Sequence, residues 1–201
     1  MPLLLSKKID DHEAAYAVWK ISETNGQLQQ MIKEQPPEDY HSTKQAEWMA
    51  TRMLIENLCQ KFNLDYQGIV KDEYGKPFLK GHSAQISISH SFPIASAMIH
   101  MNSPCGIDVE WPRATMQRVQ HKFLNAEEYQ YRDDQKALCI IWAAKEAIYK
   151  RYGKKQLSFK DNMKVEITEK GLRSWMLQNG ERTEIPIIHE QVKQYLLVYT
   201  F

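Results

Sequence analysis

Two long segments with helical periodicity, each followed by strand-like segments, limit the folds that this chain can adopt. In the first, residues 43–62, apolar side chains recur at spacings of three and four. In the second, residues 135–152, Gly153 is placed to end the helix. The sequence therefore predicts an α+β fold made of two similar units, residues 1–103 and 104–201.

The remaining segments supply strands and two shorter helical segments, one of them from Asn125 to about Tyr131. The segment "AAYAVWKI" predicts a helix over Asp11–Ser22, and we expect Ser42 or Thr43 to cap the first long helix. Alternation of Ile86 and Ile88 with two serines predicts a strand. Further strands are predicted in "IASAMIHM", "GIDVE", "MKVEIT", "LRSWMLQ", "EIPIIH" and "QYLLVYTF".

Charge and composition exclude some classes of function. The chain has 26 Lys and Arg against 25 Asp and Glu, and 43% of its residues are hydrophobic. This balance is typical of a soluble globular protein and gives no sign of general nucleic-acid or membrane-surface binding. The three cysteines fit neither a disulfide framework nor a zinc site, and no signal peptide or membrane helix is predicted. We expect a cytoplasmic protein without nucleic-acid or membrane partners.

One predicted strand carries two acids. Asp108 and Glu110 lie two residues apart in "GIDVEW", so their side chains point to the same face, roughly 7 Å apart. Their repulsion needs an offset. Solvent can screen the repulsion between the two carboxylates if they lie on a wet face or on an edge strand protected by charge. A bound cation can neutralise it instead.

The second long helix adds a third acid. Trp142, Glu146 and Lys150 are four residues apart and share one helix face. The simplest interpretation of Glu146 and Lys150 is a solvated ion pair worth about 0.3–0.5 kcal/mol. If this helix meets the acidic strand, three carboxylates become available, a set that suits Mg²⁺.

Two shorter segments contain polar residues near predicted strand ends. Ser89, His90 and Ser91 end one strand, and Lys76 follows a tight turn. A histidine or lysine in such a place is most often an ordinary surface residue. The chain has no Walker A or G-x-G-x-x-G segment, so scattered groups would have to hold a nucleotide. It has no G-x-S-x-G segment either, which makes Ser89 a poor candidate nucleophile.

The sequence Gly-Ile-Asp-Val-Glu at residues 106–110, followed by Trp-Ala-Ala-Lys-Glu-Ala-Ile-Tyr-Lys at 142–150, resembles the signature pair of the 4′-phosphopantetheinyl transferases. Upstream, residues 75–77 (Gly-Lys-Pro) and 87–91 (Ser-Ile-Ser-His-Ser) resemble two more motifs of that superfamily. The segments "HKFLNAEEY" and "EWMATRML" resemble further parts of it. The resemblance covers roughly residues 40–160.

The length of the chain indicates a subtype. With 201 residues, it resembles the larger, surfactin-type enzymes, which fuse two α+β units in one chain. That resemblance implies pseudo-twofold symmetry between the units, an active cleft between them and a monomeric protein. It also assigns coenzyme A contacts to the first unit and the metal and catalytic motifs to the second.

The resemblance implies a Mg²⁺-dependent transfer. The 4′-phosphopantetheine group of coenzyme A would pass to a serine of an apo acyl or peptidyl carrier protein, leaving 3′,5′-ADP. Asp108, Glu110 and Glu146 would hold Mg²⁺. Glu146 would also take the serine proton, directly or through a metal-bound water, and Lys150 would neutralise or protonate the leaving phosphate.

The resemblance also assigns residues to coenzyme A and to the carrier. His90 would contact the 3′-phosphate, Lys76 the nucleotide or pyrophosphate, and Lys145 a phosphate. Ser89 and Arg52 would also lie near the cofactor. A basic, partly apolar surface would receive the acidic helix of the carrier, with three candidate residues: Arg118, Lys122 and Phe123. Phe123 could equally belong to the core.

Two other functions remain open on the sequence. A non-catalytic relative would bind coenzyme A or a carrier without transfer, although retention of all three acids and the helix lysine argues against it. A Mg²⁺-dependent phosphohydrolase would also use three carboxylates. Only the transferase adds the mass of phosphopantetheine to an apo carrier protein.

Overall fold

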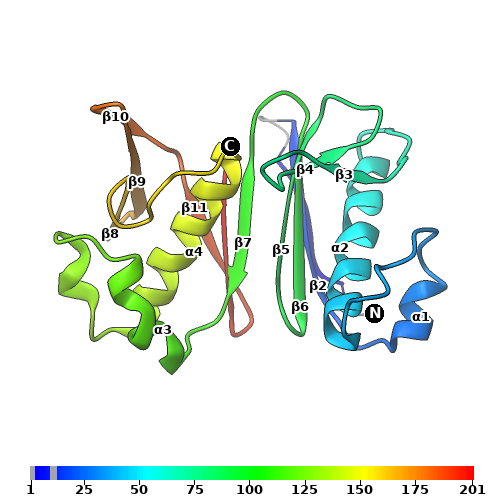
Figure 1. The fold of residues 1–201 in the computed structure, drawn as a ribbon, viewed down its shortest axis with the longest axis horizontal. Helices are drawn as coiled ribbons and strands as arrows, with labels where there is room; N and C mark the ends of the chain where they lie inside the picture. Colours follow the sequence, from blue (N-terminus) through cyan, green and yellow to red (C-terminus); the bar gives the residue numbers. More distant parts are fainter. Residues whose placement is uncertain (1–2, 10–12) are drawn as a thin grey trace. The chain divides into compact units, whose positions relative to one another are not determined.

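The computed structural model describes residues 3–9 and 13–201 of the chain (Figure 1). It divides into two compact units, Met1–Cys105 and Gly106–Phe201. Both units combine helices with antiparallel strands, which confirms the predicted α+β class. The expected pseudo-twofold relation between the units stays a prediction.

The first unit is built on a six-stranded sheet whose strands follow the order β1-β2-β6-β5-β4-β3, with every neighbouring pair antiparallel. Its strands are β1 (Leu3–Ile9), β2 (Ala14–Lys20), β3 (Ile69–Lys71), β4 (Pro77–Leu79), β5 (Gln85–Ser91) and β6 (Ile94–His100). Two helices accompany the sheet: α1 (Asn25–Gln29) and α2 (Ser42–Gln60). Helix α2 packs against β6, β2 and β5.

The prediction of a helix over Asp11–Ser22 was wrong. The residues Ala14–Lys20 form strand β2, which pairs with β1 on one side and β6 on the other. Ala14 to Val18 are buried without alternation because both faces of the strand are covered. A short apolar run of this kind cannot be told from a buried helix by periodicity. The predicted start, Asp11, lies outside the described residues.

Helix α2 is confirmed apart from its cap, whereas α1 has no counterpart in the prediction. His41, and neither Ser42 nor Thr43, caps α2: its Nδ1 atom accepts from the Lys44 amide at 3.3 Å. Helix α1 was not predicted; it begins at a capping box formed by Thr24 and Gln27. The apolar stripe of α2 faces the core of the unit, as its spacing predicted.

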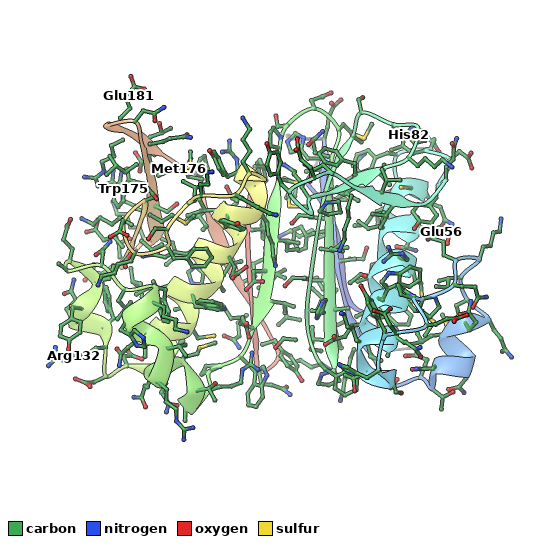
Figure 2. All side chains as sticks on the ribbon, in the orientation of Figure 1. Glu56, His82, Arg132, Trp175, Met176 and Glu181 are labelled. Carbon is green, nitrogen blue, oxygen red and sulfur yellow. The ribbon has the colours of Figure 1, made fainter. Side chains whose placement is uncertain are left out.

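The second unit contains two three-stranded sheets, ordered β10-β9-β8 and β11-β12-β7. The strands are β7 (Gly106–Glu110), β8 (Met163–Thr168), β9 (Gly171–Gln178), β10 (Glu181–Glu184), β11 (Ile188–Val192) and β12 (Tyr195–Thr200). The helices are α3 (Ala114–Val119), α4 (Gln135–Tyr152) and two 3₁₀ segments, η2 (Gln120–Lys122) and η3 (Glu128–Tyr131). Figure 2 labels Trp175 and Met176 on β9 and Glu181 on β10.

Helix α4 begins and ends where its sequence indicates. The Asp134 carboxylate caps the N-terminus by accepting from the amides of Lys136 and Ala137 at 2.8 and 3.0 Å. At the other end Gly153 adopts φ 71°, a left-handed conformation that glycine reaches without strain. The strand predicted for "EIPIIH" is instead divided between β10 and β11, because Pro186 has no N–H for a sheet ladder.

Helix α4 packs directly on β7 and β12, and Gly106 permits the closest part of this contact. A Cβ atom at Gly106 would lie 1.9 Å from the Ala147 carbonyl oxygen and 2.9 Å from the Arg151 amide nitrogen. Both atoms belong to the helix backbone, so they cannot swing away. The alanines 143, 144 and 147 are fully buried, which confirms the close packing that their size indicated.

We expect Gly106→Ala to destabilise the protein by about 3 kcal/mol or more, because the helix must move as a body to admit the methyl group. Denaturant unfolding measures the change. Gly26→Ala is the control: nothing lies within 4 Å of its added Cβ, and α1 gains about 0.5–1 kcal/mol of helix propensity. Equal stability of the two variants would contradict this account of the β7–α4 contact.

Candidate active site

Strand β7 turns its two acids toward α4. Alternation along the strand places Gly106, Asp108 and Glu110 on one face, and Gly106 already touches the helix. The Asp108 residue is only 4% exposed, so this is no wet strand face. The interpretation of these acids as solvated or edge-protecting residues therefore fails for Asp108.

Lys150 forms an ion pair with Asp108. Its Nζ atom lies 2.7 Å from Asp108 Oδ1 and donates also to the Ile107 carbonyl oxygen at 3.1 Å. The expected solvated pair between Glu146 and Lys150 is replaced by this contact from helix to strand. The Lys150 side chain keeps 25% of its surface exposed, which leaves part of it open to solvent.

Glu110 is held by two donors. The Trp142 indole Nε1 atom donates to Glu110 Oε1 at 3.2 Å, and the Arg113 guanidinium forms a salt bridge with Oε2. Trp142 thus contacts the acidic strand from the helix face on which the sequence placed it together with Glu146 and Lys150. Arg113 was missed; a basic residue three positions after Glu110 was the available signal.

Glu146 completes the group on α4. Burial raises the pKa of its carboxyl to about 7; Lys150 opposes this shift, and Asp108 and Glu110 add to it. The three acids and Lys150 therefore influence one another electrostatically. A carboxyl with a pKa near 7 can take up and release a proton at neutral pH.

The chemistry of this donor set fits a divalent cation. Three carboxylates are directed to the contact between β7 and α4, and their mutual repulsion contributes to the raised pKa of Glu146. Carboxylate oxygens suit Mg²⁺, which usually keeps several of its waters. In residues 3–9 and 13–201, however, no three His, Cys, Asp or Glu side chains are already arranged as a metal site.

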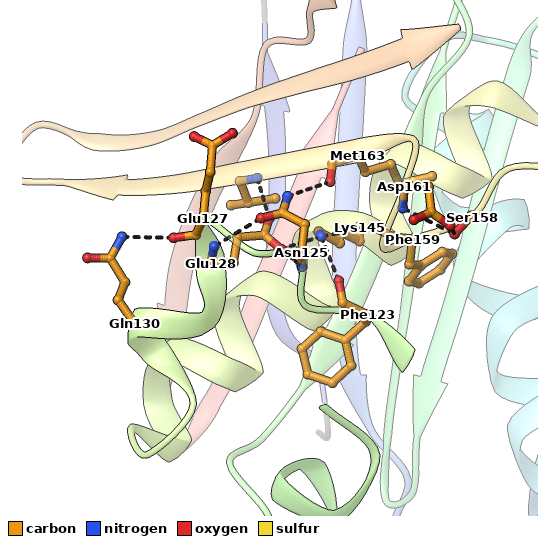
Figure 3. A network of polar contacts seen from close by, with 11 residues as sticks. Phe123, Asn125, Glu127, Glu128, Gln130, Lys145, Ser158, Phe159, Asp161 and Met163 are labelled. Atoms are coloured by element: carbon orange, nitrogen blue, oxygen red, sulfur yellow. Dashed lines mark hydrogen bonds and ion pairs between the residues drawn. The ribbon is translucent and has the colours of Figure 1, made fainter. Parts of the chain in front are cut away.

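Lys145 lies apart from this group. Its side chain is fully buried, and Nζ donates to Glu128 Oε2 at 2.5 Å and to the carbonyl oxygens of Phe123 and Phe159 at 2.7 and 2.8 Å (Figure 3). An ammonium group has three N–H donors, and all three are used here. The expectation that Lys145 contacts a phosphate is corrected accordingly. Its partner Glu128, 1% exposed, was missed, although it lies in the "HKFLNAEEY" segment.

In the first unit, His90 contacts α2. Its Nδ1 atom lies 3.1 Å from Glu47 Oε2, and the other oxygen of that carboxylate accepts from the Phe92 amide at 3.2 Å. The His90 side chain is 49% exposed, so it remains accessible to a ligand. Ser89, on the same strand, is 5% exposed.

Arg52 is committed within the first unit. Its guanidinium lies 3.4 Å above the Trp48 ring and forms a salt bridge with Glu34 at 3.3 Å. The second oxygen of Glu34 accepts from the Tyr66 hydroxyl at 2.5 Å. Because Arg52 is 7% exposed and already paired, we do not retain it among the expected coenzyme A ligands.

Lys76 follows a turn that fixes its backbone. Its amide donates to Asp72 Oδ1 at 2.8 Å, next to Gly75 with φ 88°. Its Nζ atom lies 5.9 Å from the centre of the Phe78 ring. The structure thus places Lys76 at the end of the turn between β3 and β4, in agreement with the tight turn predicted before it.

Two of the three residues expected on the carrier-binding surface are exposed, namely Arg118 and Lys122. Phe123 is not: it is fully buried, with its ring centre 5.3 Å from that of Trp142. Of the two interpretations of Phe123, the docking residue is wrong and the core residue is confirmed, because Phe123 belongs to the core of the second unit.

Comparison with known families agrees with this geometry. Residues 104–200 match the family model described as the 4′-phosphopantetheinyl transferase superfamily. The matched part contains β7, α4 and the four charged residues gathered between them. The second unit of the chain is thus similar to the 4′-phosphopantetheinyl transferase superfamily. No curated protein matches the chain.

The match indicates a transferase of the phosphopantetheinyl kind; proteins of that superfamily in general use coenzyme A as substrate and a carrier protein as partner. The surfactin-type subtype stays a prediction. None of the helices in the described residues is both long and apolar enough to cross a membrane.

Proposed function

We propose that this chain is a cytoplasmic, Mg²⁺-dependent 4′-phosphopantetheinyl transferase that converts an apo acyl or peptidyl carrier protein to its holo form. The observation that carries the proposal is the contact of β7 with α4, where Asp108, Glu110, Glu146 and Lys150 come together. Packing of the strand on the helix alone would not require a buried acid and a titratable carboxylate at this point. Phosphoryl transfer, by contrast, needs groups that position the phosphates and neutralise their charge.

The proposed reaction is a displacement at phosphorus. The carrier serine oxygen forms a bond to the phosphorus that bears pantetheine, and the bond from this phosphorus to the bridging oxygen breaks. The serine proton passes to Glu146, whose pKa near 7 suits a general base at neutral pH. The departing 3′,5′-ADP carries the electron pair on its 5′-phosphate, where Lys150 offsets the new charge.

Asp108, Glu110 and Glu146 are the proposed holders of Mg²⁺. When bound, the ion would supply positive charge for the pyrophosphate oxygens. Lys150 holds one oxygen of Asp108, while Trp142 and Arg113 orient Glu110. These contacts fix the direction of two carboxylates before any ligand arrives.

Two residues of the first unit are the proposed coenzyme A contacts on the structure, His90 and Lys76; Ser89, which is 5% exposed, is proposed on the resemblance alone. His90 is assigned to the 3′-phosphate because its ring is exposed and Glu47 orients it. Arg118 and Lys122 of the second unit are the proposed cationic contacts for an acidic carrier helix.

A panel of apo carrier proteins with coenzyme A and Mg²⁺ tests the proposal. Intact-mass measurement should show the addition of one phosphopantetheine group to at least one carrier, together with release of 3′,5′-ADP. Cleavage of coenzyme A without carrier modification would identify a phosphohydrolase. Binding of coenzyme A or of carrier without either product would identify a non-catalytic relative.

The role of His90 predicts a ligand-specific loss. His90→Ala should weaken coenzyme A by roughly 10- to 150-fold, since a hydrogen bond to a charged group is worth about 1.5–3 kcal/mol. Affinity for 3′-dephospho-coenzyme A should hardly change. Calorimetry with both ligands measures this difference, and His82→Ala, a histidine elsewhere in the same unit, is the control. Equal losses for both ligands would remove the 3′-phosphate assignment.

A further inference from the structure

A buried ammonium group joins three segments of the second unit. Lys145 Nζ binds the carbonyl oxygens of Phe123 and Phe159 and the carboxylate of Glu128 (Figure 3). These partners lie 22, 14 and 17 residues away in the sequence. One side chain thus fixes α4 to the loop before η3 and to the loop before β8.

The two residues that supply carbonyl oxygens also supply rings. The Phe123 ring meets the Trp142 indole edge to face, with centres 5.3 Å apart, and the Phe159 ring lies 5.5 Å away at 46°. Trp142 is therefore in contact with the side chains of both residues whose backbones Lys145 holds. Displacement of either carbonyl would displace a ring that packs on the indole.

The indole connects this cluster to the candidate active site, because its N–H donates to Glu110 at 3.2 Å. We propose that Lys145 is a positioning residue: by holding the backbones of Phe123 and Phe159, it fixes Trp142 and thereby orients the Glu110 carboxylate. The proposal rests on the proposed function only for the role of Glu110. Lys145 itself touches neither Glu110 nor, in the proposed reaction, coenzyme A.

Glu128 makes this arrangement possible within an apolar core. One of its oxygens accepts from Lys145 and from the Asn125 amide at 3.0 Å, and the other accepts from the Val165 amide at 2.7 Å. The buried charge on each side is thereby satisfied. Apolar residues of similar volume could replace such a buried ion pair without loss of stability. Stability alone therefore does not explain the Lys145–Glu128 pair, whereas a role in fixing the local geometry does.

The test uses a double variant, Lys145→Met/Glu128→Gln, which removes both buried charges and nearly preserves volume. The readout is the indole N–H resonance of Trp142 in a nitrogen–proton NMR spectrum of the ligand-free protein. The chain has five tryptophans, and the resonance lost in Trp142→Phe identifies the right one. Glu110→Ala gives its position when the hydrogen bond is broken.

We expect the Trp142 resonance of the double variant to move toward its position in Glu110→Ala. Ile187→Ala, which shortens a buried side chain of the same core without removing a polar group, should leave it in place. If the double variant does not fold, Lys145→Arg carries the same test, because a planar guanidinium cannot reproduce the three contacts of an ammonium. A resonance unchanged from wild type overturns the proposal.

A Mg²⁺ titration separates this proposal from the proposed function. Outer contacts that orient metal ligands typically contribute 10- to 100-fold to metal affinity or activity. The double variant should therefore need roughly 10- to 100-fold more Mg²⁺ for half-maximal transfer and for half-maximal change of the Trp142 resonance. An unchanged Mg²⁺ requirement despite a moved resonance overturns the positioning role. A wild-type protein without transfer or Mg²⁺ response refutes the proposed function, while the ligand-free spectra still decide whether Lys145 positions Trp142.

Discussion

Glu146→Gln is expected to abolish transfer and, at the same time, to stabilise the ligand-free protein above neutral pH. The loss of transfer follows from removing the proposed base and one metal ligand. The gain in stability follows from burial and from the neighbouring acids Asp108 and Glu110, which make a charge on Glu146 unfavourable. A glutamine has a similar shape and carries no charge at any pH.

The sign of the pH dependence is fixed by the raised pKa. In the folded state the Glu146 carboxyl has a pKa of about 7, whereas its ordinary value is 4.5. Between these values the folded state binds more protons than the unfolded state, so the free energy of unfolding falls as pH rises. At 1.36 kcal/mol per pH unit, the loss is at most about 3 kcal/mol and is complete above pH 7.

Denaturant unfolding of wild type and Glu146→Gln at pH 5 and pH 8 measures this effect. The stability of the variant relative to wild type should increase from pH 5 to pH 8. Glu169→Gln, an exposed carboxylate of the same unit, is the control and should show no such trend.

Added Mg²⁺ should stabilise wild type at pH 8 and affect the Glu146→Gln variant much less, because a ligand that binds only the folded state stabilises it. A variant with wild-type turnover would refute the assignment of Glu146.

Much of the candidate site could be predicted because its parts lie in regular elements. Strand alternation placed Asp108 and Glu110 on one face, and helical spacing placed Trp142 and Glu146 on another. The sequence could not show that the two faces meet. That contact depends on Gly106, whose missing side chain lets the helix backbone approach β7.

The errors have a common physical origin in burial. Strand β2 resembled a helix because both of its faces are covered. Phe123 resembled a docking residue because the ring that it packs against, Trp142, lies on α4 and is distant in the sequence. The resemblance assigned Lys145 to a phosphate, although its side chain points away from Glu146 on the helix. A lysine is rarely buried unless it is paired, and its partner Glu128 lies 17 residues away in an irregular segment, where spacing gives no guide.

Lys150→Ala is the second variant with a large expected effect, because Lys150 pairs with Asp108 in the candidate active site. Lys150→Ala should lower kcat by about 10²- to 10⁴-fold and raise the KM for coenzyme A much less. The cation meets charge that grows on the departing 3′,5′-ADP, so it binds the transition state more tightly than the ground state. Steady-state kinetics with one good carrier, varying coenzyme A, measure both constants.

A second role of Lys150 must be separated from the first, because its Nζ atom lies 2.7 Å from the buried Asp108 carboxylate. If Lys150 serves only as a counterion to Asp108, a high concentration of Mg²⁺ should supply the missing charge and restore kcat. If it also acts on the departing phosphate, most of the loss should persist at saturating Mg²⁺. A second variant, Lys150→Arg, keeps the positive charge but changes the shape of the cation and its ability to donate a proton. We therefore expect partial activity for Lys150→Arg. Lys136→Ala, exposed in the first turn of the same helix, controls for loss of a helix cation. A kcat for Lys150→Ala within about twofold of wild type, a difference of only ~0.4 kcal/mol, would show that the reaction draws its positive charge from another group.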